Sequence, residues 1–448
     1  MNTLIEIASA LNAKCKGKNH TWQGGVSIDS RTIAPGDLYV AMIGQNADGH
    51  QFVEDAKKRG ALAAIINKEV ITDLPVIKVA DTHQALIDLA RWYRQCMSTI
   101  KVVAVTGSCG KTTSRALLQS IFSQAGPTLA SIKSFNNDIG VPVTLLNLKM
   151  EHRYLICEMG ANHSGEIAQL THLAKPDVAI ITLAAPAHLE GFGNMEGVAC
   201  AKGEIFQGLS DKGVAIINAD DQFARFWKRL AGVRRVMTFG LREQADVTAK
   251  KIKIQQNGTA SFILHYKNQA LPVQLQLIGH HNVMNALAAA TAGFALGLTM
   301  SQIQVGLNVA HTEKNRLVLK RGVLGARVID DSYNANPSSM QAAIEILTHF
   351  SGDTILVMGD MLELGQNANI YHAKIGEFAR EKGVNQLYCY GQHSRFAANA
   401  FGTKAYHFDD QLNLINVLRK QLHVDMTVLI KGSNSMHMHR IADALTEE

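Results

Sequence analysis

Short apolar runs that each lead into a helical pattern recur through the middle of the chain. They lie at residues 102–105, 154–157, 178–183 and 214–217. Continuous apolar strands that alternate with helices are typical of a parallel sheet whose two faces are both covered. We therefore predict a doubly wound parallel sheet for this part of the chain. The first run stops at a glycine-containing loop, and a helical pattern resumes at about Thr112.

The segment before residue 84 predicts a smaller α/β unit. Its helical patterns lie at 4–11 and 51–59, and its strand-like runs lie at 26–30, 38–42, 61–66 and 76–79. The turn-prone sequence Ala34-Pro35-Gly36-Asp37 separates the first two strands. A segment of roughly eighty residues is long enough to form a domain of its own.

The pattern changes twice more in the second half of the chain. Residues 245–277 alternate between apolar and polar positions around Asn257-Gly258, which predicts antiparallel strands joined by a hairpin turn. A helix is predicted at 282–296, and a third series of strands follows at 327–329, 354–358, 386–390 and 427–430. Because 448 residues exceed the usual size of one domain, we expect an α/β protein of three domains. The predicted bounds are 1–83, 84–311 and 312–448, and the last domain is expected to be Rossmann-like.

The composition is that of a globular protein, with 47% hydrophobic and 18% charged residues. The net charge of +6 is spread along the chain without a basic block, which disfavours a nucleic-acid partner. The six cysteines form no CxxC pair, so neither a disulfide framework nor a zinc site is expected. No leader pattern and no apolar stretch of about 18 residues occur. We therefore expect a cytoplasmic protein that does not insert into a membrane. A monomer is the expected oligomeric state.

The strongest chemical signal is a loop between a predicted strand and a predicted helix, Thr106-Gly107-Ser108-Cys109-Gly110-Lys111-Thr112-Thr113. Its glycines allow backbone N–H groups to converge on phosphate oxygens, and the helix N-terminus adds positive potential. Lys111 is suited to the β- and γ-phosphates of a nucleotide and Thr112 to Mg²⁺. The common form of this loop has glycine at the position of Val105, so a glycine turn with an incidental lysine is the alternative interpretation.

Two further polar side chains follow predicted strands, at the sheet edge where open α/β sheets bind ligands. Glu158 ends the run at 154–157, and His188 lies in the glycine-containing segment 185–194. We predict that both bind a metal ion. The alternatives are a solvated glutamate at a strand end and a histidine with a structural role.

At two other positions, residue type alone indicates a structural role and no part in the chemistry. Lys202 has the features of a surface lysine on a helix. His280 and His281 are adjacent, and adjacent side chains diverge on a helix, so helix capping is a simpler interpretation than a shared metal ion.

The loop TGSCGKTT resembles the phosphate loop of the Mur ligase and folylpolyglutamate synthetase superfamily. Residues 280–286, 315–317 and 330–337 fit the same resemblance. It implies that Asn282 contacts adenine and that Asp331 holds the ribose hydroxyls. The full set of ATP contacts that it implies is Gly107, Ser108, Cys109, Gly110, Lys111, Thr112, Thr113, Asn282, Arg316 and Asp331.

The same resemblance implies a metal site and a modified lysine. In the Mur ligase family the lysine that matches Lys202 is carbamylated by CO₂, which turns an ammonium group into an anionic ligand. Two Mg²⁺ ions are then implied, with Thr112, Glu158, His188 and the carbamate of Lys202 as ligands. The implied catalytic residues are Lys111, Glu158, His188 and Lys202.

Three segments of the first domain, 29–31, 35–38 and 48–52, look like the UDP-binding domain shared by the later Mur ligases. Ordinary turn chemistry is the alternative, because Asp, Gly and Pro occur in many loops. The resemblance implies a UDP-substrate site formed by Ser30, Arg31, Asp48, Gly49, His50, Asn136 and Asn137.

Residues 134–142 and 357–365 resemble the branch of the family that adds D-Ala-D-Ala. The DNPR motif of many diaminopimelate-adding members is absent. The implied substrates are ATP, UDP-MurNAc-tripeptide and D-Ala-D-Ala, joined through an acyl phosphate during peptidoglycan precursor synthesis. The family's C-terminal KGSR ends here with Asn434, which leaves the role of the arginine unfilled. Another amino-acid ligase of the superfamily and, from a different class, an ATP-driven switch or kinase are the alternatives.

Overall fold

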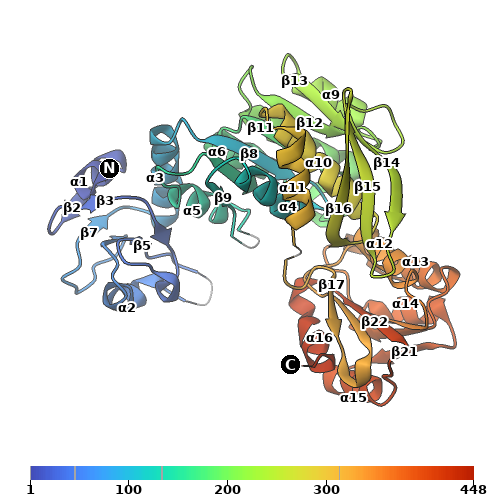
Figure 1. Cartoon of the computed structure of the whole chain (residues 1–448). Helices are drawn as coiled ribbons and strands as arrows, with labels where there is room; N and C mark the ends of the chain where they lie inside the picture. Colours follow the sequence, from blue (N-terminus) through green and yellow to red (C-terminus); the bar gives the residue numbers. More distant parts are fainter. Residues whose placement is uncertain (1, 45–46, 133–134, 312, 448) are drawn as a thin grey trace.

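The computed structural model describes residues 2–44, 47–132, 135–311 and 313–447, and over these ranges the chain forms three α/β units (Figure 1). The N-terminal unit in blue lies at one side of the central unit, and the C-terminal unit in orange and red lies below the central one. The predicted three-domain α/β class is confirmed. No helix within the described ranges is both long and apolar enough to cross a membrane.

The N-terminal unit is built on a sheet with the strand order β2-β7-β6-β5-β4. Its elements are β1 (Asn2–Thr3), α1 (Leu4–Ala10), β2 (Lys14–Lys16), β3 (Thr21–Trp22), β4 (Val26–Ser27), β5 (Leu38–Val40), α2 (Val53–Lys58), β6 (Ala63–Ile66) and β7 (Val76–Lys78). The strand predicted at 26–30 is shorter, because the Asp29 carboxylate accepts from Arg31 N and starts a 3₁₀ turn at Ser30–Thr32. The helix predicted at 51–59 likewise starts as a 3₁₀ turn at Gly49–Phe52, before α2.

Helix α3 (Thr82–Cys96) joins the N-terminal unit firmly to the central unit. The Tyr93 ring lies 4.7 Å from the Trp22 ring, and its hydroxyl donates to the Leu148 carbonyl at 2.8 Å. One buried apolar cluster runs without a break from α1 into the central sheet. The expected domain boundary at 83/84 lies in the first turn of α3 and stays a prediction. The other expected boundary, 311/312, adjoins residue 312, which is outside the described ranges.

The central unit has the strand order β16-β15-β14-β13-β12-β11-β8-β10-β9. Its strands are β8 (Lys101–Thr106), β9 (Thr128–Ala130), β10 (Tyr154–Glu158), β11 (Val178–Ile181), β12 (Val214–Asn218), β13 (Arg235–Phe239), β14 (Val247–Ile254), β15 (Thr259–Tyr266) and β16 (Gln269–Ile278). Strands β8 to β13 pair in parallel, and β15 pairs antiparallel with both β14 and β16. The predicted parallel sheet and its antiparallel extension are therefore both confirmed.

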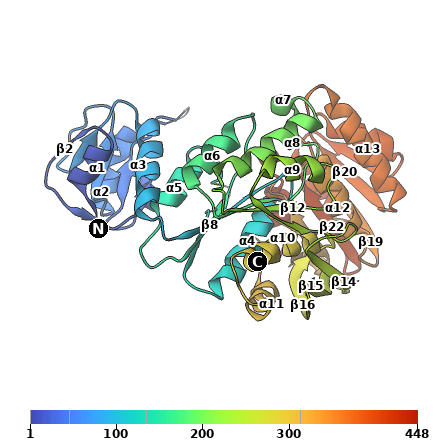
Figure 2. The same cartoon turned by 90° about the horizontal axis from the view of Figure 1, so that it is seen from above.

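Helices cover both faces of the parallel part of this sheet (Figure 2). The central helices are α4 (Lys111–Ser123), α5 (Gly140–Leu146), α6 (Glu166–Ala174), α7 (Leu189–Phe192), α8 (Met195–Gly203), α9 (Ala224–Ala231), α10 (His281–Ala295) and α11 (Met300–Val309). Side chains of α4, α10 and α11 share one apolar cluster with the sheet, and those of α5, α6, α8 and α9 share the opposite one. The double winding leaves the carboxyl ends of β8, β10 and β11 together at one edge.

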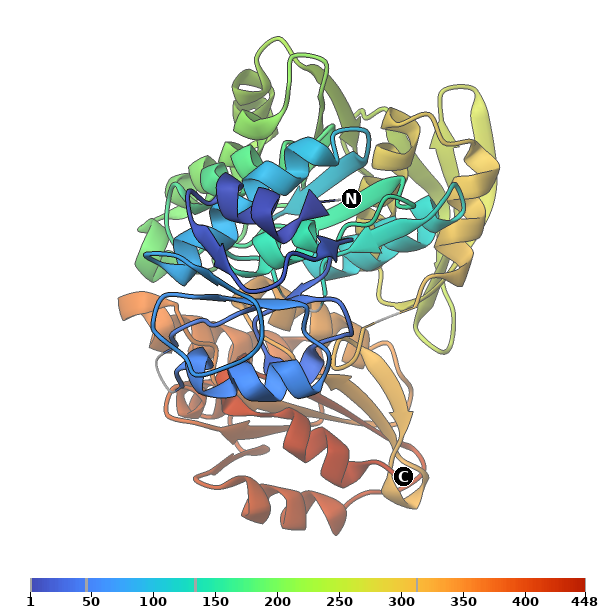
Figure 3. The same ribbon diagram turned by 90° about the vertical axis from the view of Figure 1, so that its left-hand side faces the viewer.

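The C-terminal unit has the strand order β17-β18-β22-β19-β20-β21 and lies below the central unit in Figure 3. Its strands are β17 (Val318–Arg321), β18 (Arg327–Asp331), β19 (Asp353–Gly359), β20 (Gln386–Tyr390), β21 (Ala405–Phe408) and β22 (Met426–Lys431). Its helices are α12 (Pro337–Leu347), α13 (Ala368–Glu381), α14 (Ser394–Phe401), α15 (Gln411–Arg419) and α16 (His439–Leu445). All pairs are parallel except that of β17 with β18. The carboxyl ends of β18 and β22 carry Asp331 and Lys431 toward the central unit.

Candidate active site

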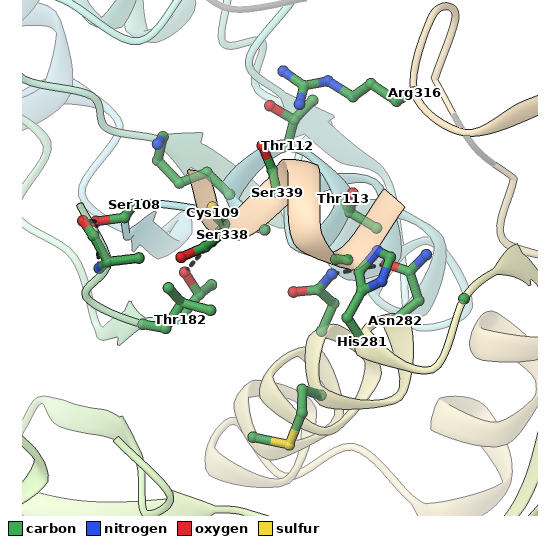
Figure 4. A pocket seen from close by; sticks show the side chains of 18 of the residues that line it. Ser108, Cys109, Thr112, Thr113, Thr182, His281, Asn282, Arg316, Ser338 and Ser339 are labelled. Atoms are coloured by element: carbon green, nitrogen blue, oxygen red, sulfur yellow. Dashed lines mark hydrogen bonds between the residues drawn. The ribbon is translucent and has the colours of Figure 1, made fainter. Parts of the chain in front are cut away.

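A cleft of about 1030 Å³ lies between the central and C-terminal units (Figure 4). Its walls are the loop after β8, the ends of β10 and β11, the start of α10, the linker before β17 and the start of α12. The two sheets thus direct their strand ends at one space, which is where α/β folds place ligands.

The phosphate loop at the start of α4 depends on two glycines. Gly107 has φ +150° and Gly110 has φ +82°. A Cβ atom at Gly107 would collide with the Thr182 hydroxyl, and one at Gly110 would collide with the Asn285 amide. Glycine is therefore required at both positions, and α4 begins at Lys111 with its free backbone N–H groups at the cleft.

The side chain of Lys111 folds back onto the phosphate loop. Its Nζ atom donates to the Gly107 carbonyl at 2.6 Å, and the residue lines the cleft. Burial lowers the pKa of Lys111, while the charge of Glu158 acts in the opposite direction. The ammonium group is thus held at the loop by one carbonyl oxygen, which a phosphate oxygen would replace.

Glu158 is only 1% exposed, so the interpretation as a solvated glutamate is wrong. Its Oε1 atom accepts from Thr112 Oγ1 at 3.2 Å and from Asn136 Nδ2 at 2.8 Å. Its Oε2 atom has no hydrogen-bond partner among the described residues. The carboxylate is therefore oriented through Oε1, while Oε2 lies 3.4 Å from Nε of the buried Arg115 without a hydrogen bond.

His188 faces the C-terminal unit. Its backbone is left-handed, with φ 52°, and its Nδ1 atom lies 2.5 Å from Oε2 of Glu363. Hydrogen bonding to His188 holds the pKa of Glu363 below its usual range. Among the described residues, no group of three or more His, Cys, Asp or Glu side chains forms a metal-binding cluster. The structure therefore brings Thr112 and Glu158 together, with His188 turned to Glu363.

Lys202 is not a surface lysine, because it is 2% exposed. Its Nζ atom lies 5.1 Å from the centroid of the Phe192 ring, and the ring of His188 lies 6.4 Å from the same ring. Burial, with a further contribution from the charge of Lys111, lowers the pKa of Lys202 to about 7. A substantial neutral fraction of this amine is therefore present near pH 7.

The expected nucleotide contacts converge from three elements. Asn282 is buried at the start of α10, where its Nδ2 atom donates to the Ile278 carbonyl at 2.8 Å. Asp331 ends β18, and its Oδ2 atom accepts from Lys431 Nζ at 2.6 Å. Burial raises the pKa of Asp331, and the charge of Lys431 opposes that shift. The guanidinium group of Arg316 stacks on the Tyr333 ring at 4.0 Å, over the cleft (Figure 4).

The start of α12 lies directly against the phosphate loop (Figure 4). Asn336 caps this helix, and its Nδ2 atom lies 3.2 Å from the sulfur of Cys109. Thr113, Ser338 and Ser339 also line the cleft. Two helix N-termini, those of α4 and α12, therefore face the place where the loop would hold phosphate.

The residues expected to bind the UDP-substrate lie elsewhere. Within the described ranges only Asn136 of that set lines the cleft. Both ring nitrogens of His50 are used inside the N-terminal unit, by Asp48 at 2.6 Å and by the Asn67 N–H at 3.1 Å. Asn137 accepts from the Gly140 N–H at the start of α5, at 2.9 Å.

Ser30 is buried, Arg31 is exposed and paired with Asp29, and Gly49 accepts from the Tyr39 hydroxyl. Their expected contact with a UDP-substrate stays a prediction. Ser134, the first residue of one of the segments used for the resemblance, lies outside the described ranges.

Four contributors to the site were not assigned roles from the sequence: Arg115, Glu313, Glu363 and Lys431. Each acts through a partner far away in the chain, so no local pattern could identify it. Lys431 does begin the segment Lys431-Gly432-Ser433-Asn434, which matches the family's KGSR except for its last residue. Asn434 itself donates from Nδ2 to the Tyr333 carbonyl at 3.1 Å, and so supports the ring on which Arg316 stacks.

Models of one protein family match most of the chain. The Mur ligase middle domain matches residues 105–293, the Mur ligase glutamate ligase domain matches 315–434, and the Mur ligase family catalytic domain matches 24–94.

Proteins named UDP-N-acetylmuramoyl-tripeptide–D-alanyl-D-alanine ligase are similar over the whole length. The one from Escherichia coli (strain K12) is 40% identical, over 99% of this chain and 98% of the relative. The one from Haemophilus influenzae is 35% identical over the same shares.

Solved structures agree with this similarity. A crystal structure of MurF from Acinetobacter baumannii has a TM-score of 0.89 at 34% identity, over 99% of this chain and 98% of that one. MurF ligase from Thermotoga maritima in complex with ADP has a TM-score of 0.82 at 26% identity, over 94% of this chain and 97% of that one.

Proposed function

This chain belongs to the Mur ligase family, and we propose that it is the ATP-dependent ligase of that family that joins D-alanyl-D-alanine to UDP-N-acetylmuramoyl-tripeptide. The products are the UDP-linked pentapeptide, ADP and phosphate. The observation that carries the proposal is full-length similarity to relatives of this activity, together with a phosphate loop that faces Asp331 and Arg316 across one cleft. The reaction belongs to peptidoglycan synthesis and to the ligase class EC 6.3.2.10.

ATP is bound with its phosphates at the start of α4. The N–H groups of the loop and the ammonium group of Lys111 surround the phosphate oxygens, and α12 adds a second helix N-terminus. Asn282 lies at the adenine end, and Asp331 and Arg316 hold the ribose and phosphates from the C-terminal side. The proposed working unit is a monomer, and consumption of ATP fits a cytoplasmic location.

The chemistry proceeds in two steps. A carboxylate oxygen of the tripeptide attacks the γ-phosphorus of ATP, the bond to the β–γ bridging oxygen breaks, and ADP leaves with the electron pair. The amine of D-alanyl-D-alanine then attacks the acyl carbon, loses a proton, and expels phosphate from the tetrahedral intermediate. Lys111 offsets negative charge where carboxylate and triphosphate meet, which is the main obstacle to the first step.

The residues at the end of β10 fit a divalent cation. Thr112 supplies a hydroxyl, and Glu158 supplies a carboxylate oxygen without a hydrogen bond, both of which are hard oxygen ligands. Bound Mg²⁺ would supply charge neutralisation at the phosphate oxygens. His188 and Lys202, whose side chains both lie near the Phe192 ring, are the proposed protein ligands of a second Mg²⁺.

Lys202 fits the carbamate that its family implies. A carbamate forms when a neutral amine attacks CO₂ and loses a proton. The lowered pKa of Lys202 supplies the neutral amine, and its burial keeps competing water away. The carbamate replaces the buried positive charge of Lys202 with a negatively charged group that has two oxygen ligands.

Release of phosphate from ATP is expected to require both other substrates. The acyl phosphate needs the tripeptide carboxylate, and turnover needs the amine of D-alanyl-D-alanine to remove the acyl group. Phosphate should be measured with each substrate omitted in turn, and with L-alanyl-L-alanine as a matched control. Rapid ATP hydrolysis that ignores both substrates would indicate a nucleotide switch and contradict the proposal.

A further inference from the structure

Arg115 lies one turn after Thr112 on α4, and the residue is almost completely buried at 3% exposure. It touches three separate parts of the chain. Nη1 donates to the Ser131 carbonyl at 2.6 Å, Nη2 pairs with Oε1 of Glu313, and Nε lies 3.4 Å from Oε2 of Glu158. One positive charge is therefore shared by two carboxylates.

The sharing is unequal. The contact with Glu313 is a hydrogen-bonded ion pair, whereas Nε of Arg115 and Oε2 of Glu158 are close without forming a hydrogen bond. Arginine forms its strongest pairs when two N–H groups meet both oxygens of one carboxylate. In this structure, Glu313 holds the end of Arg115 that such a pair with Glu158 would need.

Glu313 belongs to the linker between α11 and β17, which joins the central and C-terminal units. The linker conformation is specific, because the non-glycine residues Asn315 and Leu317 have left-handed backbones with φ 64° and φ 53°. Leu317 N donates to Asp331 Oδ1 at 3.2 Å, and Tyr333 N donates to the Asn315 carbonyl at 3.1 Å. The linker residues that follow Glu313 are therefore attached to the C-terminal unit, and the Glu313 carbonyl accepts from the Arg316 N–H at 3.2 Å.

We propose that Glu313 is a positioning residue for the cation site. Through Glu313, the affinity of this site for a cation depends on the position of the C-terminal unit. By holding Arg115, Glu313 keeps Oε2 of Glu158 available to a divalent cation. When the linker moves and Glu313 separates from Arg115, Arg115 forms a bidentate ion pair with Glu158. Cation binding then becomes weaker. The inference rests on the proposed function, since Glu158 is a cation ligand there.

The test is the affinity of the full-length protein for Mn²⁺ in the presence of ADP, measured by electron paramagnetic resonance. Glu313→Gln should raise the dissociation constant for Mn²⁺ by roughly fivefold to tenfold, because Arg115 is released onto Glu158. Arg115→Gln in the same chain should bring the dissociation constant back to within about twofold of the unaltered protein. Glu313→Asp, which keeps the charge, should lie between Glu313→Gln and the unaltered protein.

The matched control is Glu447→Gln, which removes the carboxylate of an exposed pair with Arg321 at 3.0 Å. It should leave Mn²⁺ affinity unchanged. Unchanged affinity in a folded Glu313→Gln protein would overturn the inference, and so would a double variant that binds Mn²⁺ no better than Glu313→Gln. Failure of the unaltered protein to join its substrates would instead count against the proposed function, because the Mn²⁺ pattern does not depend on ligation.

Discussion

Replacing Lys111 with methionine is expected to lower the rate of ligation by about 10³-fold. Methionine keeps most of the length and apolar character of the lysine side chain and removes its charge. Lys111 lies at the loop itself, with Nζ bonded to the Gly107 carbonyl at 2.6 Å. The loss should appear mainly in kcat, because charge builds up at the γ-phosphate during transfer.

The measurement is phosphate release at saturating concentrations of all three substrates. Lys101→Met is the matched control, since Lys101 starts the same strand β8, is exposed, and pairs with Asp177 at 2.8 Å away from the cleft. Thermal unfolding should be compared for both variants. A folded Lys111→Met protein that keeps more than a tenth of the activity would contradict the role of Lys111 in phosphoryl transfer.

Lys202→Ala is expected to abolish most ligation, by about 10²-fold or more, and added acetate should restore part of it. Removal of the side chain takes away the carbamate oxygens and leaves a space beside Phe192 that a short carboxylate can enter. Binding of the UDP-substrate should stay nearly intact, because most of its expected residues lie in the N-terminal unit. Rescue by methylamine but not by acetate would mean that Lys202 acts as a cation.

The carbamate should be visible by ¹³C nuclear magnetic resonance after addition of ¹³C-bicarbonate. Because burial lowers the pKa of Lys202 to about 7, the neutral amine becomes the main form as the pH rises through 7. The signal should therefore grow between pH 6 and pH 8, and a free lysine would need a much higher pH. Lys202→Ala should lack the signal, and Lys212→Ala, which changes an exposed lysine in the following loop, should keep it.

The parallel sheets could be predicted in part, because β8, β10, β11 and β12 are short apolar runs that each lead into a helix, whereas β9, β13 and β21 were not predicted. The antiparallel extension was equally clear, since polar and apolar residues alternate along β14 to β16 and Asn257-Gly258 turns between two of these strands. Strand β17 was missed. It is an edge strand of four residues with a charged end, so it has neither a buried run nor a regular alternation.

Local chemistry predicted the phosphate loop, because all of its parts lie in one stretch of sequence. The partners of Arg115 and His188 could not be predicted in the same way. The Arg115 contact with Glu313 joins positions 198 residues apart, and it depends on how two units are placed. Burial of Lys202 could not be predicted either, because a lysine in a helix is normally exposed and its burial here results from tertiary packing.

The most direct test of the central claim is mass spectrometry of the products formed from ATP, D-alanyl-D-alanine and UDP-N-acetylmuramoyl-tripeptide labelled with ¹⁸O in its terminal carboxylate. Ligation through an acyl phosphate predicts a UDP-linked pentapeptide and a phosphate that carries one ¹⁸O atom, because the attacking carboxylate oxygen leaves with the phosphate. A pentapeptide formed with unlabelled phosphate would contradict the acyl-phosphate route. Absence of the pentapeptide, with ATP consumed, would contradict the assignment of this chain as the ligase.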